Sequence, residues 1–282
     1  MSKLETARRD WYPVAMADEL QPGDSRRSRL LEEDILLRAE QDGTITVHSG
    51  ETQWLTQIAY GHIWTSPSQS PRTLFAIPEA AENGRRLVNC GVVRVKCSPL
   101  RAVENFLDVA HFPFVHTDIL GAEPHTEVEP YQVTIDETND EVLATEVKFF
   151  QPQAAKSAGE GIVTDYVYRV PAPMVALLYK TCPPKPEAQD VIGLFVQPLD
   201  EESCDVWAWM ALYDDETPMA ELIQFQQMIF LQDRSILENQ VPRKLPLEPG
   251  LEIPTRADST SGAYRRWLKR RGAYYGALEP VQ

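Results

Sequence analysis

Apolar and polar residues alternate over short runs along much of the chain, a pattern typical of half-buried β-strands. Before residue 75 such runs cover 34–39, 44–47 and 53–64, and the Asp42-Gly43 pair predicts a hairpin turn between the first two. Runs rich in Val, Ile, Tyr and Trp predict later strands at 85–97, 127–135, 141–150, 161–170, 174–180, 190–197 and 204–213. Most of these strands follow one another without an intervening helix, which favours an antiparallel sheet.

A helical period replaces the strand pattern at 218–239. Leu222, Phe225, Ile229 and Ile236 are spaced by three, four and seven residues, so they form one apolar stripe. We therefore expect a long helix with one face against the sheet.

Two shorter helices are predicted at 99–108 and 259–270. Ser98 is a suitable N-cap for the first, and Pro99 fits its first turn. The second ends in cations that suit a helix C-terminus, so we expect them on the solvent face: Arg265, Arg266, Lys269, Arg270 and Arg271.

The clearest change of composition lies at 67–84, which is rich in Pro, Ser and small residues, as linkers are. A boundary near residue 75 divides the chain into a small β-rich unit, 1–75, and a larger α+β domain, 76–282. The small unit would have a thin core by itself, so we expect it to lean on the larger domain.

Charge and cysteine content limit the function. The chain has 282 residues, with 42 Asp and Glu against 27 Lys and Arg, for a net charge of -15. This acidity argues against nucleic acid and anionic membranes as partners. Four sparse cysteines suggest reduced core thiols. No stretch approaches the ~18 apolar residues of a membrane span, so we expect a cytoplasmic protein.

Two of the five histidines lie close together in an apolar segment, 104–116. His111 and His116 are five residues apart, and on an ideal helix their side chains would diverge by about 140°. Pro113 lies between them and would interrupt the helix, which allows the two imidazoles to converge. Buried imidazoles need hydrogen-bond or metal partners.

Asp233 is the third candidate ligand, because it shares the apolar face of the long helix with Phe225, Ile229, Ile236 and Gln240. A carboxylate on a core-facing stripe must be paired or bound to metal. Two imidazoles and one carboxylate form the facial triad that non-heme Fe(II) prefers, with zinc as the main competitor. The spacing alone equally fits a hydrogen-bonded core histidine pair and an Asp233–Arg234 ion pair.

The segment N-F-L-D-V-A-H-F-P-F-V-H, 105–116, resembles the iron-site signature D-x-x-H-x-x-x-x-H of the Rieske non-heme iron oxygenases. The segments at 11–23 and 256–268 also resemble this family. The resemblance implies a mononuclear Fe(2+) held by His111, His116 and Asp233, with Asp108 as the family's bridging aspartate. It also implies an antiparallel helix-grip sheet around the long helix, and a trimeric core.

One departure from the family changes the expected electron supply. The chain has neither the C-x-H nor the C-x-x-H pair that ligates a [2Fe-2S] cluster, so 1–75 resembles a truncated Rieske domain. Such a subunit is similar to the N7-demethylase branch of bacterial methylxanthine oxygenases. That resemblance implies O2-dependent conversion of 7-methylxanthine to xanthine and formaldehyde. It also implies a separate Rieske-containing reductase that uses NADH, and a glutathione-S-transferase-like structural subunit.

Substrate contacts are expected near Asp233. A flat, polar purine needs apolar walls and a few polar partners. We expect hydrogen bonds from Asn239 and Gln240, and walls formed by Phe225, Ile229, Leu237 and Trp209. Three alternatives remain: an O-demethylase of a methoxylated aromatic acid, a non-catalytic structural subunit of an oxygenase, and a ligand-binding module without redox chemistry.

Overall fold

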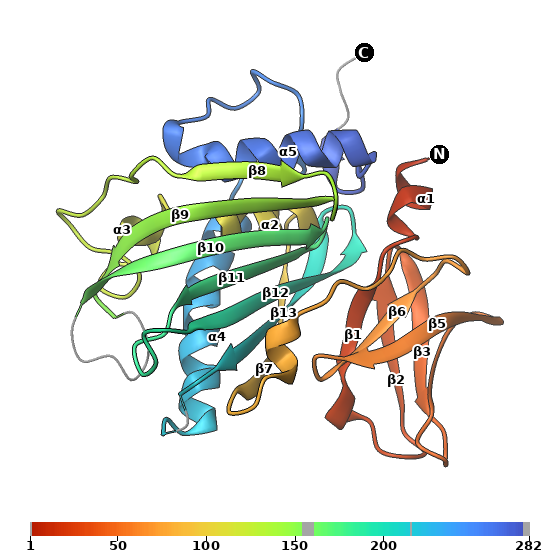
Figure 1. Ribbon diagram of the computed structural model, residues 1–282. Coiled ribbons are helices and arrows are strands. Elements are labelled where there is room, and N and C mark those ends of the chain that lie inside the picture. Colours follow the sequence, from red (N-terminus) through yellow and green to blue (C-terminus); the bar gives the residue numbers. More distant parts are fainter. Residues whose placement is uncertain (1, 154–160, 215, 279–282) are drawn as a thin grey trace.

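The computed structural model describes residues 2–153, 161–214 and 216–278, which form two parts (Figure 1). The first part is a six-stranded antiparallel sheet in the order β1-β6-β5-β4-β3-β2. Its elements are α1 (Lys3–Ala7), β1 (Tyr12–Met16), the 3-10 turn η1 (Ala17–Glu19), β2 (Ser25–Leu30), β3 (Glu33–Ala39), β4 (Ile45–Ser49), β5 (Thr52–Ala59) and β6 (His62–Ser66).

The hairpin turn predicted at Asp42-Gly43 connects β3 and β4, and Gly43 takes a positive φ of 84° that a residue without Cβ adopts freely. The run predicted as one strand at 53–64 is two strands. The chain reverses at Tyr60 and Gly61, where φ is 53° and 70°. The helix α1 and the strands β1 and β2 had no counterpart in the sequence pattern.

The second part is a seven-stranded antiparallel sheet in the order β7-β13-β12-β11-β10-β9-β8. The predicted antiparallel sheet is confirmed, although β8 begins five residues later than the run at 127–135. Its strands are β7 (Arg86–Val95), β8 (Gln132–Asp136), β9 (Glu141–Gln151), β10 (Ile162–Ala172), β11 (Val175–Thr181), β12 (Gln189–Asp200) and β13 (Ser203–Leu212).

Helices cover one face of this sheet, and the long helix α4 crosses behind it in Figure 1. The α4 helix packs on β7, α2 packs on β11 and β12, and α5 lies along β8 and β9. The remaining elements are η2 (Pro78–Ala81), α2 (Pro99–Leu107), α3 (Phe112–Val115), α4 (Met219–Leu237), η3 (Arg256–Asp258), α5 (Ser259–Arg271) and the paired short strands β14 (Leu245–Pro246) and β15 (Ala277–Leu278).

The apolar stripe predicted on α4 needs one correction. Leu222, Ile229, Asp233 and Leu237 are buried, whereas Ile236 is 44% exposed. At about 100° per residue the buried positions centre between Ile229 and Leu237, so Ile236 lies at the rim of the buried face.

The opposite face of the sheet packs against the first part, so β12 and β13 are buried on both sides. An aromatic cluster fills this contact, with Trp64 from β6, Phe195 from β12 and Trp207 and Trp209 from β13. The small sheet therefore shares its core with the larger one, as its size requires. The boundary near residue 75 stays a prediction and falls in the connector between β6 and β7.

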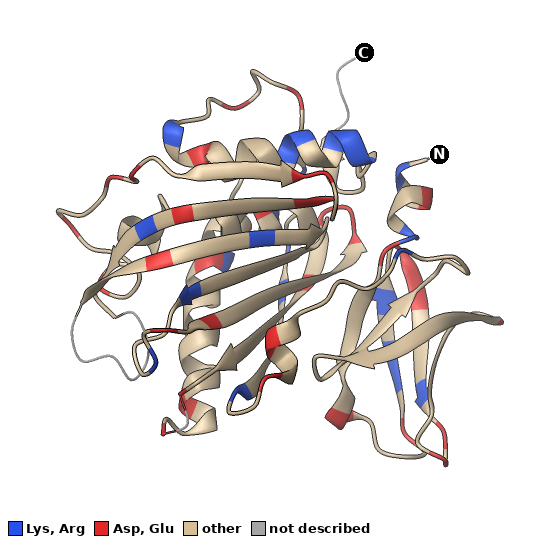
Figure 2. Cartoon of the chain, viewed as in Figure 1, with Lys and Arg blue, Asp and Glu red and all other residues tan. Residues whose placement is uncertain are grey.

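Cations along α5, seen in Figure 2, hold distant segments together. The solvent-face prediction is wrong for Arg265 and Arg271. The Arg265 guanidinium pairs with Glu104 and Glu252 at 2.5–2.8 Å. Arg101 on α2 pairs with the same two carboxylates, so the two arginines together neutralise them.

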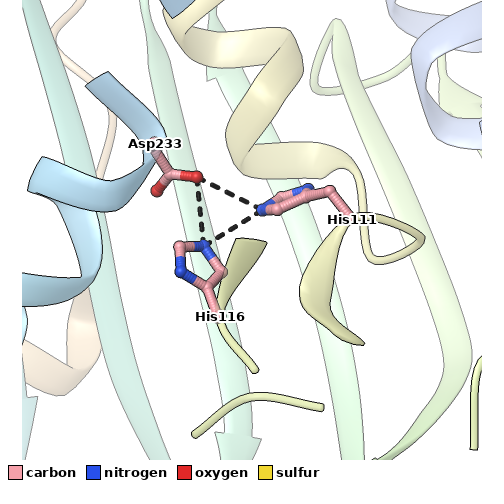
Figure 3. A group of neighbouring side chains, drawn as sticks. All are labelled: His111, His116 and Asp233. Carbon is pink, nitrogen blue, oxygen red and sulfur yellow. Dashed lines mark hydrogen bonds and ion pairs between the residues drawn. The ribbon is translucent and has the colours of Figure 1, made fainter. Parts of the chain in front are cut away.

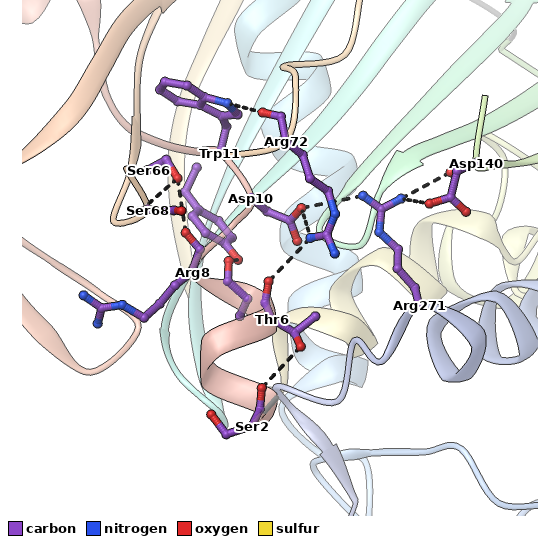
Figure 4. A network of polar contacts seen from close by, with 12 residues as sticks. Ser2, Thr6, Arg8, Asp10, Trp11, Ser66, Ser68, Arg72, Asp140 and Arg271 are labelled. Atoms are coloured by element: carbon purple, nitrogen blue, oxygen red, sulfur yellow. Dashed lines mark hydrogen bonds and ion pairs between the residues drawn. The ribbon is translucent and has the colours of Figure 1, made fainter. Parts of the chain in front are cut away.

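Arg271 belongs to a chain of ion pairs that joins the N-terminal segment to the larger domain (Figure 4). Its side chain is 9% exposed and lies 2.7 Å from Asp140 and 3.6 Å from Asp10. Asp10 also pairs with Arg72 at 2.8 Å. The pairs therefore tie the start of the chain to the β8–β9 turn.

All four cysteines are buried and free, which confirms the prediction that they belong to the core. Within the described ranges, no helix combines the length and apolar character needed to cross a membrane.

Candidate metal centre

Three side chains from separate segments converge on one point (Figure 3). The Asp233 Oδ1 atom lies 3.0 Å from His116 Nε2 and 3.3 Å from His111 Nε2, and the two Nε2 atoms are 3.1 Å apart. His116 is 1% exposed and Asp233 is 7% exposed. The structure thus brings together the three residues that the sequence singled out.

The local backbone explains how histidines five residues apart can meet. The α2 helix ends at Leu107, and the chain turns before α3 begins at Phe112. The helix is therefore interrupted before Pro113 and not, as the sequence had predicted, at Pro113. Pro113 itself lies in the first turn of α3, where its missing N–H costs nothing. In the loop beyond His116, the backbone at Gly121 passes close to Pro113. A Cβ at this position would lie 2.7 Å from the Pro113 nitrogen, so glycine is required there.

The outer ring nitrogens of both histidines have acceptor partners. His111 Nδ1 lies 3.1 Å from Asp108 Oδ2, and His116 Nδ1 lies 2.8 Å from Gln232 Oε1. Carboxylate and amide oxygens only accept, so each Nδ1 carries the hydrogen. In the neutral rings both Nε2 atoms therefore present lone pairs to the centre.

The centre then holds three converging acceptors. With both rings neutral, neither Nε2 atom can donate to the buried Asp233 Oδ1, and no other donor among the described residues reaches it. Converging lone pairs repel unless a proton or a cation lies between them. A divalent metal ion fits this donor set, and the two Nδ1 contacts are the kind that orient metal-ligating histidines.

Without a metal, a proton takes this place. Burial lowers the pKa of His111, but hydrogen bonds and charge from Asp108 and Asp233 outweigh it and raise the pKa to about 9. Burial raises the pKa of Asp233, while its contacts with the two histidines lower it to about 2. A metal ion binding here must displace that proton.

Comparison with known proteins decides the family. A model described as "Vanillate O-demethylase oxygenase C-terminal domain" matches residues 95–273. A protein named "Probable methylxanthine N7-demethylase NdmC", from Pseudomonas sp. (strain TJI-51), is 48% identical over 269 residues, 95% of each chain. The chain belongs to the Rieske-type oxygenases. Oxygenases of this family carry a mononuclear non-heme iron, and His111, His116 and Asp233 form a group that could hold such an ion.

Solved structures show the same fold. "Pseudomonas putida CBB5 NdmA with caffeine" aligns with a TM-score of 0.74 at 16% identity, covering 99% of this chain and 97% of that chain. "Pseudomonas putida CBB5 NdmB" aligns with a TM-score of 0.73 at 16% identity, covering 100% and 99%. The α+β fold of this oxygenase, including the β-rich N-terminal part, is therefore confirmed.

A cavity opens beside the triad of the oxygenase. Apolar residues from α2, α3, α4 and the sheet form most of its wall: Phe106, Phe112, Leu120, Leu178, Ile192, Leu194, Phe225, Ile229 and Phe230. Phe225 and Ile229 thus lie where the sequence predicted, and their contact with substrate stays a prediction. An apolar wall of this kind excludes water from the reacting centre.

Four expected cavity residues lie elsewhere. Trp209 faces the opposite side of the sheet, 5.9 Å from Tyr60 between ring centroids. Leu237 is fully buried in the core beyond the cavity. Asn239 is exposed and donates to the Ser235 carbonyl at 2.7 Å.

Gln240 is the fourth misplaced residue. Gln240 lies beyond the end of α4, so it does not share the helix face of Asp233. It lines a separate charged groove together with Asp108 and Arg265.

Other residues of the oxygenase were missed by sequence reasoning. Gln232 contacts His116, and Tyr166, Tyr168 and Lys180 line the cavity from the sheet. The two tyrosines are two residues apart on one strand, which was a signal that they share a face. No sequence pattern pointed to Gln232 or Lys180.

Proposed function

We propose that this oxygenase removes an N-methyl group from a methylxanthine, converting 7-methylxanthine to xanthine and formaldehyde. The observation that carries the proposal is the triad of buried metal-ligand atoms in a chain 48% identical to a probable methylxanthine N7-demethylase. Overall, one N-methyl group, O2, two electrons and two protons give N–H, formaldehyde and water.

Each residue near the centre has a defined task in this proposal. His111, His116 and Asp233 hold Fe(2+), which when bound supplies the activation of dioxygen. Asp108 and Gln232 keep the hydrogen on Nδ1 of each histidine, so that both Nε2 atoms remain free for the metal. The apolar wall keeps water away while the substrate is oriented.

The electrons must come from another protein, because the sequence has no C-x-H or C-x-x-H pair for a Rieske cluster. We propose a Rieske-containing reductase that oxidises NADH. Asp108 lines the charged groove and contacts His111, so it connects a donor surface to the metal centre. A glutathione-S-transferase-like subunit and a trimeric core complete the assembly in this proposal.

The test combines the iron-loaded chain with a Rieske-bearing reductase, NADH and 7-methylxanthine. Formaldehyde and xanthine should form in equal amounts, and a His116→Ala variant, which lacks one ligand, should form neither. If the wild-type chain takes up no iron after anaerobic reconstitution, the proposal is wrong and a structural or ligand-binding role is favoured.

O-demethylation is the second candidate, favoured by the family model, which carries the name of a vanillate O-demethylase. The same assay with 4-methoxybenzoate separates the two. Formaldehyde from the aryl ether, with none from methylxanthines, would replace N-demethylation by O-demethylation.

A further inference from the structure

The floor of the cavity beside the triad carries three polar side chains. Tyr166 and Tyr168 are two residues apart on β10, so their side chains share a face. Lys180 on β11 is the antiparallel partner of Tyr166, and directly opposed residues also share a face. All three line the same cavity as His111, His116 and Asp233.

The two tyrosine hydroxyls are buried without a hydrogen-bond partner in the part of the chain that the structure describes. Both side chains are 1% exposed. Their rings are held by edge contacts, Tyr166 with Phe112 at 6.3 Å and Tyr168 with Phe106 at 6.1 Å between centroids. A buried phenol that is fixed in place and has no partner is unusual in a native structure, and a ligand in the cavity would satisfy it.

Lys180 adds a cation to an otherwise apolar wall. It is 7% exposed, and burial lowers its pKa to about 8, with Asp190 and Cys182 opposing the shift. Asp190 faces it from β12 as its cross-strand partner, and Tyr166 faces it from β10. Among described residues that line the cavity from α4, only Asp233 is charged. The ammonium is therefore largely protonated at neutral pH.

We propose that Tyr166, Tyr168 and Lys180 recognise the ring carbonyl edge of a planar imide heterocycle and so decide which methyl group faces the triad. Phenol and ammonium groups donate hydrogen bonds, and ring carbonyl oxygens accept them. An apolar aromatic ring would leave the two phenol donors unsatisfied, which disfavours it. This inference rests on the proposed N-demethylase function and assigns its substrate recognition to named residues.

The test measures binding without turnover, so that it stands apart from electron supply. The dissociation constant of 7-methylxanthine for the anaerobic iron-loaded chain is measured by calorimetry, with the melting temperature of each variant recorded. Tyr166→Phe and Tyr168→Phe should weaken binding by about 3- to 10-fold, and Lys180→Met by about 10- to 100-fold. Tyr179→Phe is the matched control, because Tyr179 is on β11 next to Lys180 but packs on the opposite face of the sheet.

A pH series separates recognition from structural support. Wild-type binding should weaken as pH rises through about 8, where Lys180 loses its proton. Lys180→Arg keeps its charge and should lack this step. Ionisation of the ligand is common to both proteins, so the difference between them isolates Lys180.

The outcomes distinguish this inference from the proposed function. If the wild-type chain binds 7-methylxanthine and neither the tyrosine nor the Lys180 variants change the affinity, the inference is overturned while the N-demethylase proposal stands. If the wild-type chain instead binds 4-methoxybenzoate, with loss in Lys180→Met, the cation anchors a carboxylate and both proposals fail. Weakened binding in the three variants, with an unchanged Tyr179→Phe control, supports the inference.

Discussion

Replacing Gln232 by leucine removes the acceptor that holds the outer hydrogen of His116. The Nδ1–Oε1 distance is 2.8 Å and His116 is 1% exposed, so leucine leaves a buried N–H without the acceptor that Gln232 provides. A buried donor left without a partner costs about 1–3 kcal/mol. Loss of such a contact to a metal-ligating histidine typically lowers metal affinity by about 10- to 100-fold. These two estimates agree, since tenfold in affinity corresponds to about 1.4 kcal/mol.

The assay is anaerobic competition for Fe(2+) between a chelator and the protein. Gln224→Leu is the control: it makes the same exchange about two turns earlier on α4, at an exposed position. Gln232→Leu should bind iron at least tenfold more weakly than both the control and the wild type. Equal affinity for all three proteins would refute the role assigned to this hydrogen bond and weaken the case for a metal at His116.

The other predictions concern electron delivery, domain contact and pH. Asp108→Asn should retain iron and single-turnover product after chemical reduction, while NADH-driven turnover falls at least tenfold; normal turnover would remove its proposed role. Arg271→Met should lower the free energy of unfolding in urea by about 1–2 kcal/mol, because Asp140 loses its partner at 2.7 Å while Asp10 keeps its pair with Arg72. A change below about 0.5 kcal/mol would contradict this. In the metal-free chain the folded pKa of His111 is raised from 6.5 to about 9, so its stabilising contribution is complete below pH 6.5 and is lost as pH rises through 9. The free energy of unfolding of the chelator-treated protein in urea should therefore fall by on the order of 3 kcal/mol across this window, and a flat profile would exclude a stabilising proton.

Local sequence patterns were enough to find the residues that converge at the candidate metal centre. Asp108, His111 and His116 lie within nine residues, so their relation depends mainly on one short turn of backbone. Asp233 was found because a carboxylate on an apolar helical face conflicts with burial unless it has a partner. In each case the physical constraint acts over a few residues, and it is visible in the order of residue types.

The cavity was predicted less well, because its walls come from separate strands. Period-two alternation shows that Trp209 faces one side of β13, but not which side meets the helices. The small N-terminal sheet covers the side that Trp209 faces, and the cavity lies on the other. Asn239 and Gln240 were misplaced because α4 ends at Leu237, before the helical spacing could reach them.

The amino-acid order by itself determined the oxygenase motif, the missing cluster ligands, the antiparallel sheet and the long helix, since these depend on spacing and composition. Only the tertiary structure decided that Gln232 supports His116, that Lys180 lies opposite Tyr166, and that Arg271 joins the two ends of the chain. Strand register, helix rotation and the contact between the two sheets set these pairings, and they are fixed by packing across the whole molecule.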